Sequence, residues 1–159
     1  MEPIIRLKDV IQEMDVFSDE YRAFLNIRTG EFVTFSNEEL DAAEKGGNIE
    51  DFPEWQHEII QKASEVLLTD NYRELPSKFD IHEYSIMERF CYTVKDDELS
   101  RRLLNSIRGR GAFRYFKDTI HAYGIEKDWY EYREQAFKEI AIDWLEGNKI
   151  AYTDENEGG

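Results

Sequence analysis

The stretch DWYEYREQAFKEIAIDWLEG, residues 128–147, is the longest helical pattern in the chain and decides its fold. Asp128 and Glu131 have the spacing of a capping box, in which each side chain accepts a hydrogen bond from a free backbone N–H of the other residue. Mostly apolar residues then recur every three or four positions, which places them on one side of a helix. This stripe consists of Tyr130, Arg133, Phe137, Ile140, Ala141, Trp144 and Leu145. We predict a long helix that ends near Gly147 and supports the core.

Six shorter helices are predicted before this one. Apolar side chains recur at helical spacing in residues 7–16, 36–46, 53–67, 80–94, 96–109 and 111–124. Ser36 with Glu39, and Asp80 with Glu83, have the spacing of further capping boxes. The aromatic residues that this periodicity assigns to the core include Trp55, Tyr84, Phe113, Trp129 and Trp144.

A β-hairpin is predicted near the N-terminus. Aromatic and β-branched runs at Tyr21–Ile27 and Phe32–Phe35 flank a short turn in which Gly30 can supply a positive φ. An isolated two-stranded hairpin is marginal in water, so its apolar face must pack on helices. The predicted fold is therefore α+β and predominantly helical, with six to seven helices packed with one N-terminal two-stranded β-hairpin.

Length and composition fit one folded domain. The chain has 159 residues, of which 41% are hydrophobic and 35% charged, so it can bury a core without disulfides. We predict a single globular domain over residues 1–152 and a flexible acidic tail over residues 153–159. Cys91 has no second cysteine to pair with, and no apolar run has the length of a signal peptide or a membrane span. These features predict a soluble cytoplasmic protein that does not bind membranes.

The candidate site is a cationic segment in an acidic chain. The formal net charge is -15, yet between Glu98 and Asp118 the chain has no acidic residue and six basic ones. These six are Arg101, Arg102, Arg108, Arg110, Arg114 and Lys117. The planar guanidinium group of arginine can bind a carboxylate or a phosphate through two parallel hydrogen bonds. We call residues 101–117 the arginine-rich segment and expect it to bind an anionic group.

Helical spacing predicts how this segment presents its charges. Offsets of 0, 4, 7 and 11 would place on one helix face Arg110, Arg114, Lys117 and His121. Gly109 and Gly111 would let that helix fold back on the preceding one. His121 is the titratable group beside this face, and nearby positive charge would favour its neutral form. The predicted binding residues are Arg101, Arg102, Arg108, Gly109, Arg110, Gly111, Arg114, Lys117 and His121.

The same segment carries a resemblance to a known family. The run Gly109–Asp118, GRGAFRYFKD, followed by Trp129 and the helix through Trp144, resembles the C-terminal signature of a bacterial uncharacterised protein family of the GRGAFRxFKD…W type. The predicted hairpin over residues 21–35 is similar to the N-terminal part of that family. The resemblance spans most of the chain and implies no activity.

Several functions fit the arginine-rich segment. The sequence favours a small binding or regulatory module that engages an anionic group on an acidic protein partner, or a phosphate-bearing ligand. A structural alternative is that the cations only pair with carboxylates of neighbouring helices. A nucleic-acid-binding protein is a further alternative, although the acidic average repels nucleic acid at long range. An enzyme acting on a phosphorylated small molecule would need a pocket bordered by Arg110 and His121.

Motifs for metal and nucleotide chemistry do not occur in the sequence. His57, His82 and His121 have no metal-ligand spacing, and the two glycines of the arginine-rich segment lack the third glycine of a dinucleotide-binding loop. Paired carboxylates such as Asp96 with Asp97 fall at predicted helix starts, where capping explains them. We therefore predict no catalytic residue, no metal and no cofactor.

Overall fold

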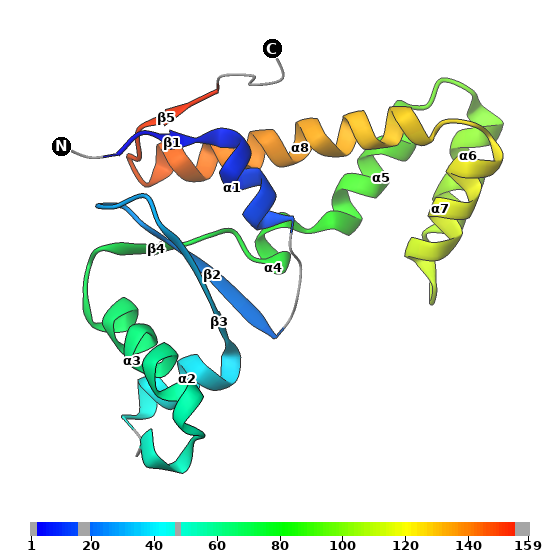
Figure 1. Cartoon of the computed structure of the whole chain (residues 1–159). Helices are drawn as coiled ribbons and strands as arrows, with labels where there is room; N and C mark the ends of the chain where they lie inside the picture. The colour runs from blue at the N-terminus through cyan, green and yellow to red at the C-terminus, as the bar shows by residue number, and fades with distance from the viewer. Residues whose placement is uncertain (1–2, 16–19, 47–48, 155–159) are drawn as a thin grey trace. The chain divides into compact units, whose positions relative to one another are not determined.

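The computed structural model describes residues 3–15, 20–46 and 49–154 (Figure 1). Contacts divide the chain into two compact units, the first containing residues 1–80 and 141–159 and the second residues 81–140. The single domain over residues 1–152 stays a prediction. Of the predicted tail, Thr153 lies in a strand and residues 155–159 fall outside the described ranges.

In the first unit, the two ends of the described chain lie side by side (Figure 1). Strand β1 (Ile5–Arg6) pairs in parallel with β5 (Tyr152–Thr153), so that Ile5 faces Tyr152 across the ladder. Helix α1 (Leu7–Met14) follows β1 and buries Leu7, Val10 and Met14, as its periodicity predicts. The predicted end near Val16 lies outside the described residues.

The predicted hairpin is confirmed and belongs to a three-stranded sheet. Strands β2 (Tyr21–Asn26) and β3 (Phe32–Ser36) are antiparallel, and Gly30 in the turn has φ 81°. Strand β4 (Tyr72–Glu74), which was not predicted, pairs antiparallel with the other side of β2, giving the order β3-β2-β4. Arg22 of β2 binds the carboxylate of Glu74 through two hydrogen bonds of 2.8 and 2.6 Å.

Two helices cover this sheet. Helix α2 (Asn37–Lys45) begins at the predicted capping box, in which Ser36 Oγ accepts from the Glu39 N–H and Glu39 accepts from the Ser36 N–H. It ends at Gly46, with φ 62°, and a short 3-10 helix, η1 (Ile49–Asp51), precedes α3 (Glu54–Leu68). The shared core consists of Phe24, Phe35, Leu40, Ala63, Val66 and Tyr72.

The predicted core position of Trp55 is wrong. Its side chain is 75% exposed, whereas Ile60, Ala63 and Val66 are the buried residues of α3. Trp55 lies in the first turn of the helix, about one turn before the partly buried Ile59 and the buried Ile60, so the hydrophobic core stops short of it. Trp144 is half-buried and donates its indole N–H to the carbonyl oxygen of Glu74 at 2.8 Å.

The predicted capping box of Asp80 and Glu83 is also wrong. Asp80 instead forms a capping box with Ser77, three residues before it. The Ser77 N–H donates to Asp80 Oδ2 at 2.9 Å, and the Asp80 N–H donates to Ser77 Oγ at 3.2 Å. This box starts the short helix α4 (Lys78–Ile81). His82, with φ 53°, then separates α4 from α5 (Glu83–Thr93), and Glu83 pairs with Arg133 at 2.7 Å.

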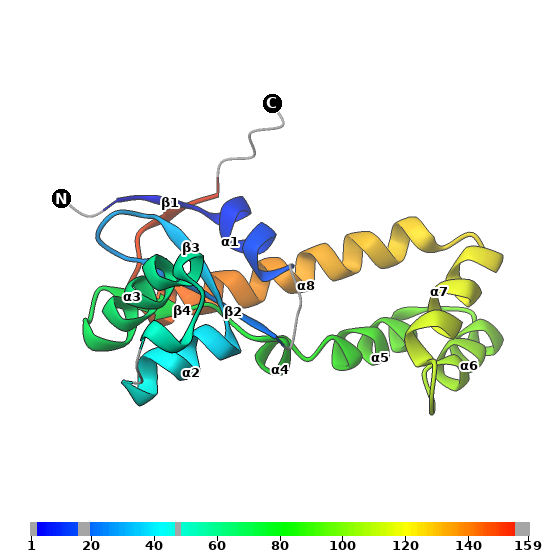
Figure 2. The same ribbon diagram turned by 60° about the horizontal axis from the view of Figure 1, so that its bottom comes forward.

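The second unit is helical and has an aromatic core. It consists of α5, α6 (Asp97–Ser106), α7 (Ala112–Ala122) and the first part of α8 (Glu126–Gly147), which can be followed in Figure 2. The ring centroid of Trp129 lies 5.4 Å from that of Phe90 and 4.9 Å from that of Phe116, both in edge-on geometry. Cys91 is fully buried beside this cluster on α5, and burial raises its pKa to about 11.

Two details of the long helix and its neighbours differ from the prediction. Helix α8 begins at Glu126, so Asp128 lies in its first turn instead of capping it. Tyr84, Phe113 and Tyr130 are exposed, although the periodicity assigned them to the core. They lie within the first five residues of α5, α7 and α8, while positions further along the same stripes, such as Phe116 and Phe137, are buried.

The predicted fold class is confirmed. The described ranges contain seven helices of eight or more residues and the single-turn helix α4, together with two small sheets. The fold is α+β and mostly helical. In this part of the chain, no helix combines the length and apolar character that a membrane span requires.

Replacing Ser36 with alanine is expected to lower the free energy of unfolding by about 1 kcal/mol, because the Glu39 N–H then loses its acceptor. Ser36→Thr keeps the hydroxyl group and is the matched control, with stability expected near that of the wild type. Urea unfolding followed by circular dichroism measures both variants. Equal losses in the two would show that this hydrogen bond does not stabilise α2.

Candidate functional site

The arginine-rich segment forms a helical hairpin. Arg101 and Arg102 lie on α6, whereas Arg114 and Lys117 lie on α7, and the two helices run side by side in both views (Figures 1 and 2). Asp96 starts α6 by accepting hydrogen bonds from the N–H groups of the second and third residues after it, at 3.0 and 3.1 Å. The hairpin belongs entirely to the second unit.

Buried apolar residues and two glycines set the geometry of the hairpin. Leu103 and Ile107 on the α6 side, and Phe116 and Ile120 on α7, are 2% exposed or less. Gly109 and Gly111, the fold-back glycines of the prediction, both have positive φ, 80° and 74°. A side chain at the second glycine would also lie 3.2 Å from the ring of Tyr115. The turn therefore requires glycine at both positions.

The predicted stripe on α7 is one residue shorter than expected. Gly111 has a left-handed backbone and caps α7, so the helix starts at Ala112 and Arg110 lies in the connecting turn. Arg114, Lys117 and His121 remain on one face of α7, at offsets of 0, 3 and 7. Arg108 also lies in the turn, after the end of α6 at Ser106.

Most cations of the segment are free of internal carboxylates. All seven predicted basic residues, His121 included, are exposed. In the described part of the chain, no carboxylate forms an ion pair with the side chains of Arg101, Arg108, Arg110, Arg114 and Lys117. The ammonium group of Lys117 lies 4.9 Å from the ring centroid of Phe113. The segment therefore presents unpaired guanidinium groups to solvent.

Arg102 has internal partners. Its guanidinium group donates to Glu98 at 3.1 Å and lies 6.0 Å from the ring centroid of Tyr123. Both interactions hold the side chain over the α6–α7 contact. An exposed pair of this kind contributes little to stability, so Arg102 can still exchange partners.

His121 is paired as well, and the expectation for its charge is wrong. Its Nδ1 forms a hydrogen bond with the carboxylate of Glu126 at the start of α8. This hydrogen bond and the negative charge of Glu126 raise the pKa of His121 above its usual 6.5. The carboxylate outweighs the neighbouring cations because it contacts the imidazole directly, whereas the cations are exposed and screened by water.

A shallow hollow of about 340 Å³ lies between α6 and α7. It is lined by Arg102, Asn105, Tyr115, Asp118, Thr119, Ala122 and Tyr123. Among the predicted site residues, only Arg102 lines it. Arg110 and His121, which a phosphorylated substrate would require at its border, are not part of its wall.

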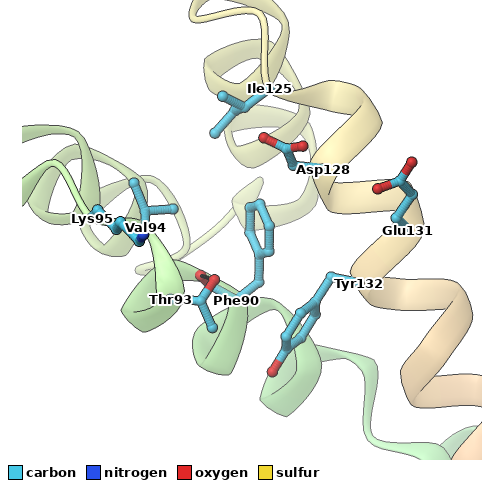
Figure 3. A pocket seen from close by; sticks show the side chains of 8 residues that line it. All are labelled: Phe90, Thr93, Val94, Lys95, Ile125, Asp128, Glu131 and Tyr132. Carbon is cyan, nitrogen blue, oxygen red and sulfur yellow. Dashed lines mark hydrogen bonds between the residues drawn. The ribbon is translucent and has the colours of Figure 1, made fainter.

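A second hollow, of about 500 Å³, contains none of the predicted site residues (Figure 3). It is lined by Phe90, Thr93, Val94, Lys95, Ile125, Asp128, Glu131 and Tyr132, from the end of α5 and the start of α8. Asp128 and Glu131 give it two carboxylates, and Lys95 gives it one ammonium group. Both carboxylates have the spacing of a capping box, so their pattern in the sequence gives no sign of this hollow. Within the described ranges, no three His, Cys, Asp or Glu side chains gather as ligands for a metal ion.

The fold and the cationic hairpin define a mostly helical α+β protein with an exposed arginine-rich surface. The chain matches the model of the Uncharacterised protein family (UPF0158) over residues 1–157, and it belongs to that family. The assignment of the family signature to Gly109–Asp118 remains a prediction.

One curated relative is the UPF0158 protein PA5073 of Pseudomonas aeruginosa, which is 33% identical over 66 residues. The match covers 41% of this chain and 43% of that protein, less than half of either. No solved structure matches the chain.

Gly109→Ala and Gly111→Ala are each expected to lower the free energy of unfolding by about 1 kcal/mol, because alanine is strained at positive φ. The loss should be larger at Gly111, where the new methyl group meets Tyr115. Gly147→Ala is the control: it lies in α8 with no atom within 4 Å of the new side chain, so stability should stay equal or rise. Urea unfolding measures all three variants. No loss at Gly109 and Gly111 would contradict the assigned turn.

The pKa of His121 is expected to be above 6.5 in the wild type and to fall in Glu126→Gln, which removes the negative partner. A raised pKa in the folded state means that His121 stabilises the fold below pH 6.5 and loses this effect as the pH rises through its folded-state pKa. NMR titration of the imidazole resonances measures the pKa, and unfolding at several pH values measures the stability. Glu134→Gln, elsewhere on α8, is the control and should leave the pKa unchanged. A wild-type pKa at or below 6.5 would refute the assigned pair.

Proposed function

We propose that this protein is a cytoplasmic binding or regulatory module that uses the arginine-rich segment to engage an anionic group on an acidic partner protein. Arg110, Arg114 and Lys117 make the direct contacts in this proposal. Arg101, Arg102 and Arg108 flank them, and the two glycines shape the turn. The observation that carries the proposal is the set of exposed cations with no ion pair to a described carboxylate.

The absence of internal pairing matters because the chain is so acidic. With 35 Asp and Glu residues against 20 Lys and Arg, a cation could readily find a carboxylate of its own chain. An exposed guanidinium group that stays unpaired adds no stability to the free protein. It can, however, form two parallel hydrogen bonds with an incoming carboxylate or phosphate. This favours an external anion over a purely structural role.

The shape of the segment favours a protein partner over a small metabolite. Arg110 and Arg108 lie in a turn, and Arg114 and Lys117 lie on an outward helix face. A small-molecule site encloses most of its ligand. The hollow of this hairpin is shallow, and Arg102 is the one cation of the segment among its lining residues. An acidic side-chain cluster of another protein can instead contact several exposed cations together.

Nucleic acid is a second candidate, because aromatic side chains accompany the cations. Tyr115 is 57% exposed on α7, and Phe113 and Tyr123 are exposed nearby. Bases of single strands stack on such rings while arginine and lysine contact the phosphates. Two of the rings already lie under cations of the same chain, Phe113 under Lys117 and Tyr123 under Arg102, which leaves Tyr115 as the free platform.

The double variant Arg110→Ala/Arg114→Ala is expected to weaken binding of a fluorescent octaglutamate peptide about three- to thirtyfold, since two charge-assisted contacts are lost. Fluorescence anisotropy at low ionic strength measures the dissociation constant. Arg89→Ala/Lys127→Ala removes the same charge from exposed positions on α5 and α8 and serves as the matched control.

Two outcomes would contradict the proposal. Equal affinity of the wild type and the Arg110/Arg114 variant for the peptide would remove the segment from the binding site. Tighter binding of a 20-nucleotide single strand, with affinity that falls steeply between two salt concentrations, would favour the nucleic-acid candidate. If filters retain no single strand at low salt, the second candidate is excluded.

A further inference from the structure

A second surface of the protein carries an exposed tryptophan in a groove. The groove lies in the first unit, between β3 and α3, and has a volume of about 610 Å³. It is lined by Glu31, Val33, Trp55, Glu58, Ile59, Gln61, Lys62 and Glu65. We call it the Trp55 groove. The function proposed for the arginine-rich segment does not involve it.

The local structure explains why these residues share one surface. Glu31 and Val33 are two positions apart along the chain at β3, so they point to the same side of the strand. On α3, the lining residues recur from Trp55 to Glu65 at steps of three and four, which is one helix face. Val33 and Ile59 also pack on the core, and they give the groove an apolar floor.

The exposed indole is the unusual feature of this surface. A tryptophan side chain that is 75% exposed forgoes the burial that large aromatic residues normally gain on folding. The core beneath it is complete without it, because Ile60, Ala63 and Val66 are the buried residues of α3. Exposed tryptophan beside an apolar floor is typical of contact surfaces.

The charges around the indole determine which kind of ligand the Trp55 groove can bind. Glu31 and Glu58 form no ion pair with a cation of the described chain, whereas Glu65 pairs with Lys62 at 3.5 Å. The ammonium group of Lys62 also lies 5.8 Å from the ring centroid of Tyr72, so the one cation of the groove is occupied internally. Glu58 therefore leaves an unpaired carboxylate in the groove that Trp55 also lines, while Glu31 lies close enough to Lys62 to interact with its charge.

We propose that the Trp55 groove binds an arginine- or lysine-bearing extended segment of a partner protein. The aliphatic part of the basic side chain lies on Val33 and Ile59. Its charged end contacts the face of Trp55 by a cation–π interaction and pairs with Glu31 or Glu58. An acidic peptide or a nucleic acid is repelled by the same carboxylates, which distinguishes this groove from the arginine-rich segment.

The test uses the full chain labelled with nitrogen-15 and the three indole N–H resonances of Trp55, Trp129 and Trp144. The Trp55→Phe variant assigns the Trp55 resonance. Because this side chain is exposed, the substitution should not disturb folding. The probe is the peptide acetyl-Ala-Arg-Ala-Arg-Ala-amide. It is expected to shift the Trp55 resonance saturably and to leave the resonance of the buried Trp129 in place.

Matched variants separate the groove from general electrostatic attraction. Glu58→Gln is expected to weaken peptide binding about three- to tenfold, as expected for the loss of one charge beside an aromatic ring. Glu134→Gln makes the same charge change on α8 and should leave the affinity unchanged. Arg110→Ala/Arg114→Ala should also bind the peptide as the wild type does, which makes this test independent of the arginine-rich segment.

Three results would overturn the proposal. The first is a Trp55 resonance that does not move with the arginine peptide. The second is an equal shift with acetyl-Ala-Glu-Ala-Glu-Ala-amide, which would indicate contact without charge selection. The third is a shift of Trp55 that grows with protein concentration alone, together with dimers in sedimentation, because the occupant would then be a second copy of the chain.

Discussion

The edge-on packing of Trp129 between Phe90 and Phe116 is the contact on which the cationic hairpin depends. These three rings come from α8, α5 and α7, so one cluster fixes three helices at once. With Phe116 fully buried, the other sides of α7 must point away from the cluster; Arg114 lies nearly opposite Phe116, and Lys117 lies on the flank between them. The position of the charges is therefore a consequence of where the aromatic side chains are buried.

Charge is unevenly distributed over a strongly acidic protein. Exposed cations that pair with no carboxylate of the described residues gather on α6, α7 and the turn between them, whereas carboxylates line a groove beside Trp55 on α3. Water and salt screen such groups in the free molecule, so leaving them unpaired costs little stability. The result is a cationic surface in the second compact unit and an acidic groove in the first.

Several features set by neighbouring residues were predictable from the sequence, although the capping boxes predicted at Asp80 and Asp128 were wrong, and features set by distant residues were not predictable. The Ser36 cap, the Asp96 cap and the hairpin turn at Gly30 depend on local backbone geometry, and the structure confirms them. Strand β4 has three residues and exists because it pairs with β2 some fifty positions earlier, a register that composition does not reveal. The exposure of the arginine-rich segment followed from its charge, but the Glu126 partner of His121 did not, because a turn separates them.

The buried cysteine has a practical consequence. Cys91 is the one thiol of the chain, it is fully enclosed, and its high pKa keeps it protonated at neutral pH. We therefore expect reagents that modify sulfhydryl groups not to react with the native protein. A cysteine engineered on the outer face of α7 would accept a fluorophore or spin label at that place alone, without first deleting the natural residue.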